Sequence, residues 1–513
     1  MGVESWEVHG VPVRAVSEVN SAEYDALVLV STEGVLPPQA LEDFVAAARQ
    51  LDASLDKNVS VLACPRVSGG RLVVSPTGPL TAYDDVRSVG EAALAGVQRA
   101  VAAGSLRPLV ALQPHSSWPN AELVTLLGAL EALYVPLQIR ESFPEEAHKV
   151  EALGVYGEGT RAPLSRLLAE GVALEISRGA ARDIGGADPE RMTPLRAAEY
   201  VRELFAPPSA VSVRVLDEPA ELRRQYPLLA AVDRAAATVE RHRGCVIFLE
   251  YVPKNYERTV MLVGKGVTFD TGGCDIKAGG VMAGMSRDKC GAAAIVGFVK
   301  ACELLQPDVK VVASLGMVRN SVGEQAYVAD ELIRSRSGLA VRIGNTDAEG
   351  RMVMGDLLAE MAERAPSEKE PHLYTVATLT GHAVRAYGAG YTAALDNHAA
   401  RALDHARALQ AAGAALGDML EVSTLRREDL AAHRGRAAGE HVHQADNAAS
   451  SALPRGHQAP AAFLLLVAAL ERGALRYTHL DVAASAGALP APPTAAPLLA
   501  LAAHYGLVHV DLC

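Results

Sequence analysis

Acidic and basic side chains gather between Lys265 and Arg351, in loops that follow short apolar runs. Four carboxylates in this stretch are candidate metal ligands: Asp270, Asp288, Asp347 and Glu349. Carboxylate oxygens are hard ligands for divalent cations, and two cations about 3.5–4 Å apart need several of them to offset the repulsion between the metals. The stretch therefore predicts a two-metal hydrolytic site.

Two lysines accompany these carboxylates, Lys265 before Asp270 and Lys277 after it. A dication favours the neutral amine of a coordinated lysine, whereas a lysine that stays off the metal keeps its proton. One of the two can therefore be a ligand and the other an electrophile. The residues themselves do not say which lysine has which role.

The local sequence around the carboxylates bears on whether they can converge. Asp347 and Glu349 are two positions apart, so an extended loop would point them to opposite sides. We expect the turn around Gly350 to fold both toward one site, and we expect the glycines after Asp270 to let backbone approach the metals. Any one of these residues alone is more commonly a solvated loop or capping residue. The specific signal is the whole ordered set.

Strand-like and helix-like patterns alternate along the first part of the chain, which predicts an α/β domain over residues 1–165. Strands are expected at 24–31, 59–67, 108–113 and 135–140, and helices at 38–51, 86–103 and 121–133. Apolar residues at helical spacing predict a connecting helix at 164–184, which Gly185 and Gly186 would end.

The rest of the chain, residues 166–513, is expected to form a second domain, which carries the candidate site residues. Short apolar runs at 259–263, 309–315, 374–379 and 477–482 are separated by longer helical segments. This pattern is typical of a mostly parallel central sheet covered by helices on both faces, in which ligands bind beyond the carboxyl ends of the strands. Asp270 follows one such run, Asp347 and Glu349 follow the run at 341–343, and Asp288 starts a helix at 290–305.

Composition limits the classes of protein that fit. At 513 residues, half of them hydrophobic and 21% charged, the chain is expected to fold as two domains. A net charge of −12 disfavours nucleic acid as a partner. The longest apolar run, 459–470, is shorter than the about 20 residues that a membrane helix needs. The six cysteines form no C-x-x-C pair and the start carries no signal-like segment, so we expect reduced thiols, no membrane association and a cytoplasmic location.

Over about residues 255–385 the ordered blocks resemble the leucyl (cytosol) aminopeptidase family. The blocks are Gly-Lys-Gly-x-x-x-Asp-x-Gly-Gly at 264–273, Lys277, Asp288, and Asn-Thr-Asp-Ala-Glu-Gly-Arg at 345–351. The resemblance implies one metal bound by Lys265, Asp270, Asp288 and Glu349 and a second bound by Asp270, Asp347 and Glu349. It implies zinc or manganese, with magnesium possible.

The same resemblance assigns roles to two more residues. Lys277 would polarise the scissile carbonyl, and Arg351 would hold a bicarbonate ion that acts as the general base. The implied reaction is the release of N-terminal amino acids from short peptides, and the implied assembly is a homohexamer with a smaller N-terminal α/β domain and a larger catalytic domain.

Some positions depart from the family pattern. The stretch 185–194 lacks the asparagines that usually open the catalytic domain, and bulky His382 stands where a small residue is usual. These departures motivate a second hypothesis, a catalytically weak or inactive scaffolding member of the family. His441 and His443 suggest an extra metal site, but no third ligand can be assigned to it. DNA binding, known for some bacterial relatives, is opposed by the net charge.

Overall fold

The computed structural model describes residues 5–511, and the chain divides into two compact units. The first comprises Met1–Gly179, Ala411–Gly417 and Val508–Cys513, and the second comprises Ala180–Gln410 and Asp418–Leu507. All residues predicted to do chemistry belong to the second unit. The boundary predicted at residue 165 falls just after the first residue of helix α5 (Leu164–Gly186) and stays a prediction.

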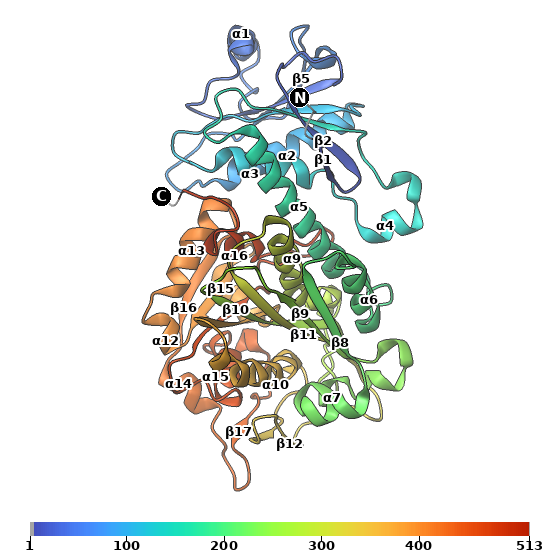
Figure 1. Ribbon diagram of the computed structural model, residues 1–513, viewed down its shortest axis with the longest axis vertical. Coiled ribbons are helices and arrows are strands. Elements are labelled where there is room, and N and C mark those ends of the chain that lie inside the picture. The colour runs from blue at the N-terminus through green and yellow to red at the C-terminus, as the bar shows by residue number, and fades with distance from the viewer. Residues whose placement is uncertain (1–4, 512–513) are drawn as a thin grey trace. The chain divides into compact units, whose positions relative to one another are not determined.

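A seven-stranded sheet with the order β1-β2-β7-β6-β3-β5-β4 forms the core of the first unit (Figure 1). The pairings from β2 through β5 are parallel, and both edge pairings are antiparallel. The strands are β1 Ser5–Val8, β2 Val11–Val16, β3 Ala26–Ser31, β4 Ser60–Ala63, β5 Arg71–Pro76, β6 Pro108–Ala111 and β7 Leu153–Tyr156. The helices are α1 Glu42–Leu51, α2 Arg87–Ala102, α3 Ala121–Glu131 and α4 Leu137–Ser142. Strands β3 and β6 are buried throughout, which explains their unbroken apolar sequences.

Two predictions for this unit are wrong in detail. Of the segment 135–140, predicted as a strand, residues 137–140 form the start of helix α4, and Pro136, the N-cap of that helix, has no N–H for a strand ladder. The strands that pair with β6 are β3 and β7, and the pattern missed β7. The run 59–67 holds only the short strand β4, since the chain turns after Cys64 and returns as the antiparallel strand β5.

An eight-stranded sheet with the order β16-β15-β18-β14-β10-β11-β9-β8 forms the core of the second unit. Its strands are β8 Val211–Leu216, β9 Cys245–Tyr251, β10 Thr259–Asp270, β11 Lys310–Asn320, β14 Pro371–Ala377, β15 Thr392–Asp396, β16 Leu420–Thr424 and β18 Arg476–Asp481. The four predicted strands correspond to the neighbours β18, β14, β10 and β11, which pair in parallel. Antiparallel β8 and β9 extend one edge. The α/β class with a mostly parallel central sheet is confirmed.

Helices cover both faces of this sheet. A side-chain carbon added to Gly264 of β10 would lie 2.7 Å from the backbone of Ala292 in α9, and one added to Gly316 of β11 would lie 2.5 Å from Val353 in α10. Gly264 and Gly316 occupy opposite faces, because neighbouring positions on a strand alternate and Lys265 pairs with Gly316. Helices α9 and α10 therefore pack on opposite faces, closely enough that only glycine fits between them and the strands.

The helices of the second unit are mostly short. They are α6 Pro194–Leu204, α7 Pro219–Gln225, α8 Pro227–Asp233, α9 Cys290–Leu305, α10 Glu349–Arg364, α11 Gly381–Tyr387, α12 His398–Arg401, α13 His405–Leu416 (which continues into the first unit), α14 Arg427–Ala432, α15 Gln458–Val467 and α16 Leu498–His504. Within residues 5–511, none of the helices has the length and apolarity needed to cross a bilayer. The five cysteines of this range are free thiols.

A small three-stranded sheet lies outside the main one and corrects a further expectation. It consists of β12 (Leu332–Arg334), β13 (Ala340–Arg342) and β17 (Val442–His443). The run before Asp347 was expected to belong to the central sheet, but it is β13 of this small sheet. The segment that carries Asp347 and Glu349 therefore reaches the site from outside the parallel core, and α10 begins at Glu349.

A buried carboxylate, Asp356, joins α10 to two neighbouring segments of the second unit. Its Oδ2 accepts the backbone N–H of Leu228 at 2.7 Å, and its Oδ1 accepts that of Arg336 at 2.8 Å. Burial raises the pKa of Asp356 to about 7, despite the two N–H donors that favour the charged form. The side chain is fully buried, so its protonation is linked to folding.

We expect the stabilisation from Asp356 to fall as the pH rises from about 4 to about 7, because the folded protein keeps a proton that the unfolded chain has already lost. Asp356→Asn cannot titrate and turns an NH₂ group toward one of the two donors. It should lower the free energy of unfolding by about 1–3 kcal/mol at pH 5 and by less at pH 8, measured by urea denaturation. Glu257→Gln, at a side chain 90% exposed, is the control. An equal difference at both pH values would contradict this linkage.

Candidate metal centre

The predicted site residues meet at the carboxyl edge of the eight-stranded sheet. Strand β10 ends at Asp270, β11 ends at Asn320, and Thr378 directly follows β14. A cavity of about 1080 Å³ opens at this edge. Its lining includes every residue to which the sequence assigned a metal or a catalytic role, namely Lys265, Asp270, Lys277, Asp288, Asp347, Glu349 and Arg351.

Each side chain is placed by a different element. Lys265 is a buried charge within β10, 2% exposed, in a strand that is otherwise almost wholly apolar. Asp288 lies in a 3-10 turn, Met285–Lys289, directly before α9, as expected from the sequence. Glu349 is the first residue of α10, where the free N–H groups and the helix dipole favour a negative charge.

Three carboxylates form the tightest group. Asp270, Asp347 and Glu349 each offer an oxygen, and these oxygens lie within 4.8 Å of one another. The expected turn is present, since Asp347 lies in the turn before α10 and Glu349 already in the helix. Gly350 matters for a different reason. A side-chain carbon at position 350 would lie 2.6 Å from Cε of Lys265. Its lack of a side chain leaves room for the lysine.

Lys265 connects this group to Asp288. Its Nζ lies 2.8 Å from Oδ1 of Asp288 and 2.8 Å from Oε1 of Glu349. The same Nζ donates a hydrogen bond to the backbone oxygen of Thr378 at 3.1 Å. Asp288 is not part of the three-carboxylate group and reaches it through the ammonium of Lys265.

Lys277 occupies the other side of the group. Its Nζ lies 2.9 Å from Oδ2 of Asp270 and 2.5 Å from Oδ1 of Asp347. The turn that carries it there contains Gly272 and Gly273, both with positive φ, and the N–H of Gly272 donates to Asp270 at 2.9 Å. The two lysines therefore hold opposite sides of one carboxylate cluster.

The cluster carries more negative charge than its two lysines offset. Burial, then the neighbouring carboxylates Glu349 and Asp270, raise the pKa of Asp347 to about 7. Burial is also the main cause that raises the pKa of Asp288 and of Glu349. For Lys265 burial acts the other way, but Asp288 and Glu349 raise its pKa well above the ordinary value. Like charges at short range in a largely buried site favour the binding of further positive charge.

Carboxylate oxygens of the cluster that have no hydrogen-bond partner indicate what could supply the missing positive charge. Oδ2 of Asp288 and Oε2 of Glu349 are buried and have no hydrogen-bond partner. Buried polar atoms are rarely left unsatisfied, and hard anionic oxygens around one cavity are the donors that divalent cations take. The residues present therefore fit a metal centre.

Arg351 is the third residue of α10 and lies on the wall of the same cavity. Its Nη1 donates to the backbone oxygen of Gln444 at 2.8 Å, while its buried Nε has no hydrogen-bond partner. Burial lowers the pKa of Arg351 to about 10. It forms no ion pair with a carboxylate of residues 5–511, so its charge is available to a small anion.

The sequence missed three residues that support the site. Asn320 donates from Nδ2 to Oδ1 of Asp270 at 2.8 Å, and the hydroxyl of Thr378 donates to Oδ1 of Asp288 at 2.9 Å. Gln444 accepts the N–H of Asn345 at 3.0 Å. Asn320 and Thr378 could have been predicted, because Asn320 ends an apolar strand and Thr378 follows one at the same edge of the sheet. No feature of the local sequence indicates the role of Gln444.

Two of the histidines that depart from the family pattern, His382 and His441, have hydrogen-bond partners in the structure. Nδ1 of His382 lies 2.8 Å from Nδ1 of His457, and the cavity lining includes Gly381 and Val384 but not His382. His441 accepts the N–H of Ala340 at 3.0 Å. In the part of the chain that the structure describes, the one group of three or more potential ligands is the carboxylate group, so the histidines at 441 and 443 gain no third ligand.

The fold and this cluster define a class: a two-unit α/β protein with a candidate metal centre at the carboxyl edge of its larger sheet. Comparison with known families is consistent with that class. The profile described as the catalytic domain of the cytosol aminopeptidase family matches residues 179–498. The chain belongs to the cytosol aminopeptidase family.

Individual relatives agree with this assignment. The Caenorhabditis elegans protein "Putative aminopeptidase W07G4.4" is 42% identical over 97% of this chain and 98% of its own length. A "Probable cytosol aminopeptidase" of Helicobacter hepaticus is 32% identical over 51% of this chain and 53% of its own length. Among solved structures, the bottromycin maturation enzyme BotP in complex with Mn superposes with a TM-score of 0.76 at 23% identity, covering 94% of this chain and 99% of that one. At that identity the likeness concerns the fold.

Glu349→Ala should lower the amount of bound metal by at least one equivalent per chain. The carboxylate of Glu349 lies between Lys265 and Asp270, so its loss removes a ligand from the middle of the cluster. Elemental analysis after dialysis against manganese or zinc measures this. Glu303→Ala, on α9, is the matched control and should retain the wild-type metal content. Unchanged metal in Glu349→Ala would contradict the assignment of this centre.

Thr378→Val keeps the shape of the side chain and the backbone oxygen that Lys265 uses, but it removes the hydroxyl that orients Asp288. Loss of such a supporting hydrogen bond typically weakens metal affinity about 10–100-fold. A competition titration with a metal-sensitive dye should show a decrease in this range. Thr392→Val removes a fully buried hydroxyl, bonded to Ser485 at 2.7 Å, and should leave the affinity unchanged.

Proposed function

We propose that the protein is a two-metal aminopeptidase that releases N-terminal amino acids from short peptides. One observation carries the proposal: four carboxylates from separate elements converge on one cavity with two lysines among them. Membership of the cytosol aminopeptidase family supports a peptidase activity. The number of metals, the substrate and the residue roles are part of the proposal.

The metal ligands would be Lys265, Asp270, Asp288, Asp347 and Glu349. Lys265 would give up its ion pairs with Asp288 and Glu349 and bind through its neutral amine. Two divalent ions held here would lower the pKa of bound water and polarise a carbonyl. Zinc and manganese both suit this donor set, and magnesium is possible. The BotP structure, described as a complex with Mn, favours a trial with manganese first.

Lys277 and Arg351 would act without binding metal. Lys277, 14% exposed at its side chain, could donate its ammonium protons to the substrate carbonyl as negative charge develops on the oxygen. Arg351 presents an unpaired Nε and could hold a bicarbonate ion, which would accept a proton from the attacking water. Both residues line the same cavity.

The cavity suits a short peptide. Its volume of about 1080 Å³ exceeds that of many small-ligand sites, and apolar side chains such as Met285, Ile276 and Leu489 line it beside the charged cluster. Uncompensated carboxylates at its base would favour the free α-amine of a substrate. We further propose that the protein works in the cytoplasm as a homohexamer, as the family resemblance implies, with neither nucleic acid nor membrane as partner.

Purified protein loaded with manganese or zinc should cleave dipeptides and amino-acid amides. Lys277→Ala should reduce kcat about 10²–10³-fold, the usual loss when one donor to a developing oxyanion is removed. It should leave bound metal unchanged by elemental analysis. Lys369→Ala, at a side chain 57% exposed, is the matched control and should retain full activity.

No turnover with any metal, while both metals are bound, would contradict the proposal and favour the scaffolding hypothesis. The variant His382→Ala then distinguishes the aminopeptidase from the scaffolding hypothesis further. Activity that appears only in this variant would show that the bulky side chain of His382 prevents hydrolysis in the wild type. Equal activity of Lys277→Ala and wild type would contradict the role of Lys277 but leave the aminopeptidase proposal standing.

A further inference from the structure

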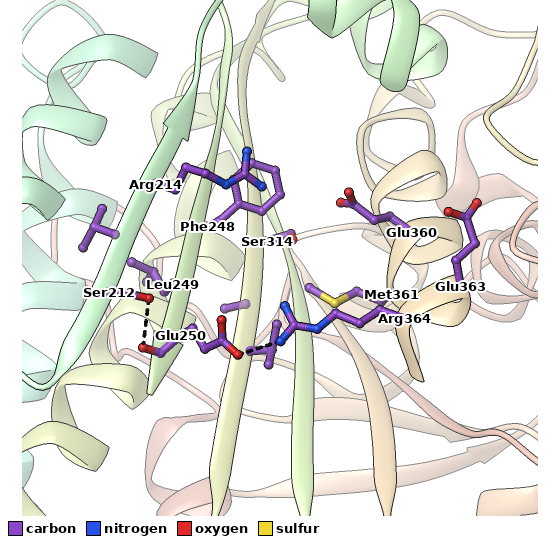
Figure 2. Close-up of a pocket in the computed structure, with 13 residues that line it drawn as sticks. Ser212, Arg214, Phe248, Leu249, Glu250, Ser314, Glu360, Met361, Glu363 and Arg364 are labelled. Carbon is purple, nitrogen blue, oxygen red and sulfur yellow. Dashed lines mark hydrogen bonds and ion pairs between the residues drawn. The ribbon is translucent and has the colours of Figure 1, made fainter. Parts of the chain in front are cut away.

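A second cavity, of about 570 Å³, lies in the second unit away from the metal centre. Its floor is formed by β8, β9 and β11 and its wall by the C-terminal half of α10 (Figure 2). It shares no lining residue with the cavity at the metal centre. Its volume falls in the range of about 300–1,000 Å³ that is typical of small-molecule sites.

Strand register explains which side chains form the floor. Arg214 of β8 pairs with Phe248 of β9, which pairs with Ser314 of β11, so these three point to one face as a row. The next row on that face contains Glu250 and Val312. Ser314 has the same orientation as Gly316, whose neighbour is α10, so the cavity lies on the α10 face.

Arg214, an exposed side chain on the edge strand β8, provides a positive charge without a carboxylate partner at one side of the floor. Its guanidinium lies 3.6 Å from the centroid of the Phe248 ring, and it forms no ion pair with any carboxylate between residues 5 and 511. The other cations nearby are paired. Arg364 lies 2.6 Å from Glu250, which also accepts from Lys310 at 3.1 Å.

Ser314 provides an unsatisfied hydroxyl in the same row. It is 1% exposed, and its oxygen has no hydrogen-bond partner. Its side chain projects from β11 between Phe248 and the residues of α10 (Figure 2). Buried hydroxyl groups are normally bonded, so this one is a second, independent indication of a ligand.

The α10 wall carries the opposite charge. Glu360 accepts the hydroxyl of Tyr226 at 2.9 Å, but its nearest cation, Arg336, lies 3.9 Å away and binds Glu363 more closely at 2.8 Å. Two carboxylates therefore share one guanidinium. The wall has one negative charge in excess, facing the positive charge of Arg214 across the cavity.

These charges select a class of ligand. A simple anion would meet Arg214 but also three glutamates, and a simple cation would meet Glu360 but also Arg214 and Arg364. A molecule with both charges satisfies both walls. Phe248, Met361 and Val312 add apolar surface between them.

We propose that this cavity binds a free amino acid with an apolar side chain. The ligand carboxylate lies at Arg214 and Ser314, and its ammonium lies at Glu360. This is the class of molecule that the proposed peptidase would release, but the binding itself does not depend on hydrolysis.

Calorimetric titration of the metal-loaded protein with L-phenylalanine tests the proposal. One binding event should persist in Glu349→Ala, which disables the metal centre, and should weaken at least about tenfold in Arg214→Ala and in Glu360→Gln. Ser314→Ala should weaken it several-fold without disturbing the floor. Arg224→Ala, an exposed arginine on α7, is the matched control and should bind as the wild type does.

Two analogues test the carboxylate and the ammonium of the ligand separately. Phenylethylamine lacks the carboxylate and 3-phenylpropanoate lacks the ammonium, and each should bind at least about tenfold more weakly than L-phenylalanine. Equal binding of 3-phenylpropanoate would overturn the zwitterion assignment. Undiminished binding of L-phenylalanine in both Arg214→Ala and Glu360→Gln, or no binding in Glu349→Ala, would overturn the site. A lower native mass of Arg214→Ala would also overturn it, in favour of a contact between copies of the chain.

Discussion

Repulsion among buried carboxylates is the constraint on which the second unit depends. Asp270, Asp288 and Glu349 are buried and Asp347 is partly buried, so water screens their mutual repulsion only weakly, and two lysines offset only part of their charge. The surrounding elements hold this arrangement in place: the parallel strands β10 and β11 fix one side, and the start of α10 provides the favourable helix dipole for Glu349. The fold contributes positions, and charge balance then calls for metal ions.

Much of this arrangement can be predicted from the sequence, because each signal is local. Strand β10 reads as an apolar run interrupted by one lysine, and that interruption marks the site as clearly as the acidic motif does. The ordered blocks between 264 and 351 place all seven predicted residues in one cavity. The parallel core follows from the same apolar runs, since strands buried on both faces lose the alternation of a half-exposed strand.

The sequence predicts less where a contact joins distant segments. Nothing local shows that the run before Asp347 pairs with β17, about a hundred residues later, or that Gln444 supports the loop of Asn345. The strand expected at 135–140 fails because a proline favours a helix start over a ladder. The cavity under α10 is likewise invisible in the sequence, because Arg214, Ser314 and Glu360 belong to three separate elements.

Gly350 restricts which residue can stand beside the lysine of this family member. Since the side chains of Lys265 and Leu379 occupy the space where a side chain at 350 would lie, any larger residue there has to push them aside. The displaced ammonium of Lys265 would move relative to Asp288 and Glu349, and the acidic quartet would lose part of its charge balance. Even an alanine at position 350 is therefore expected to disturb metal binding through the lysine.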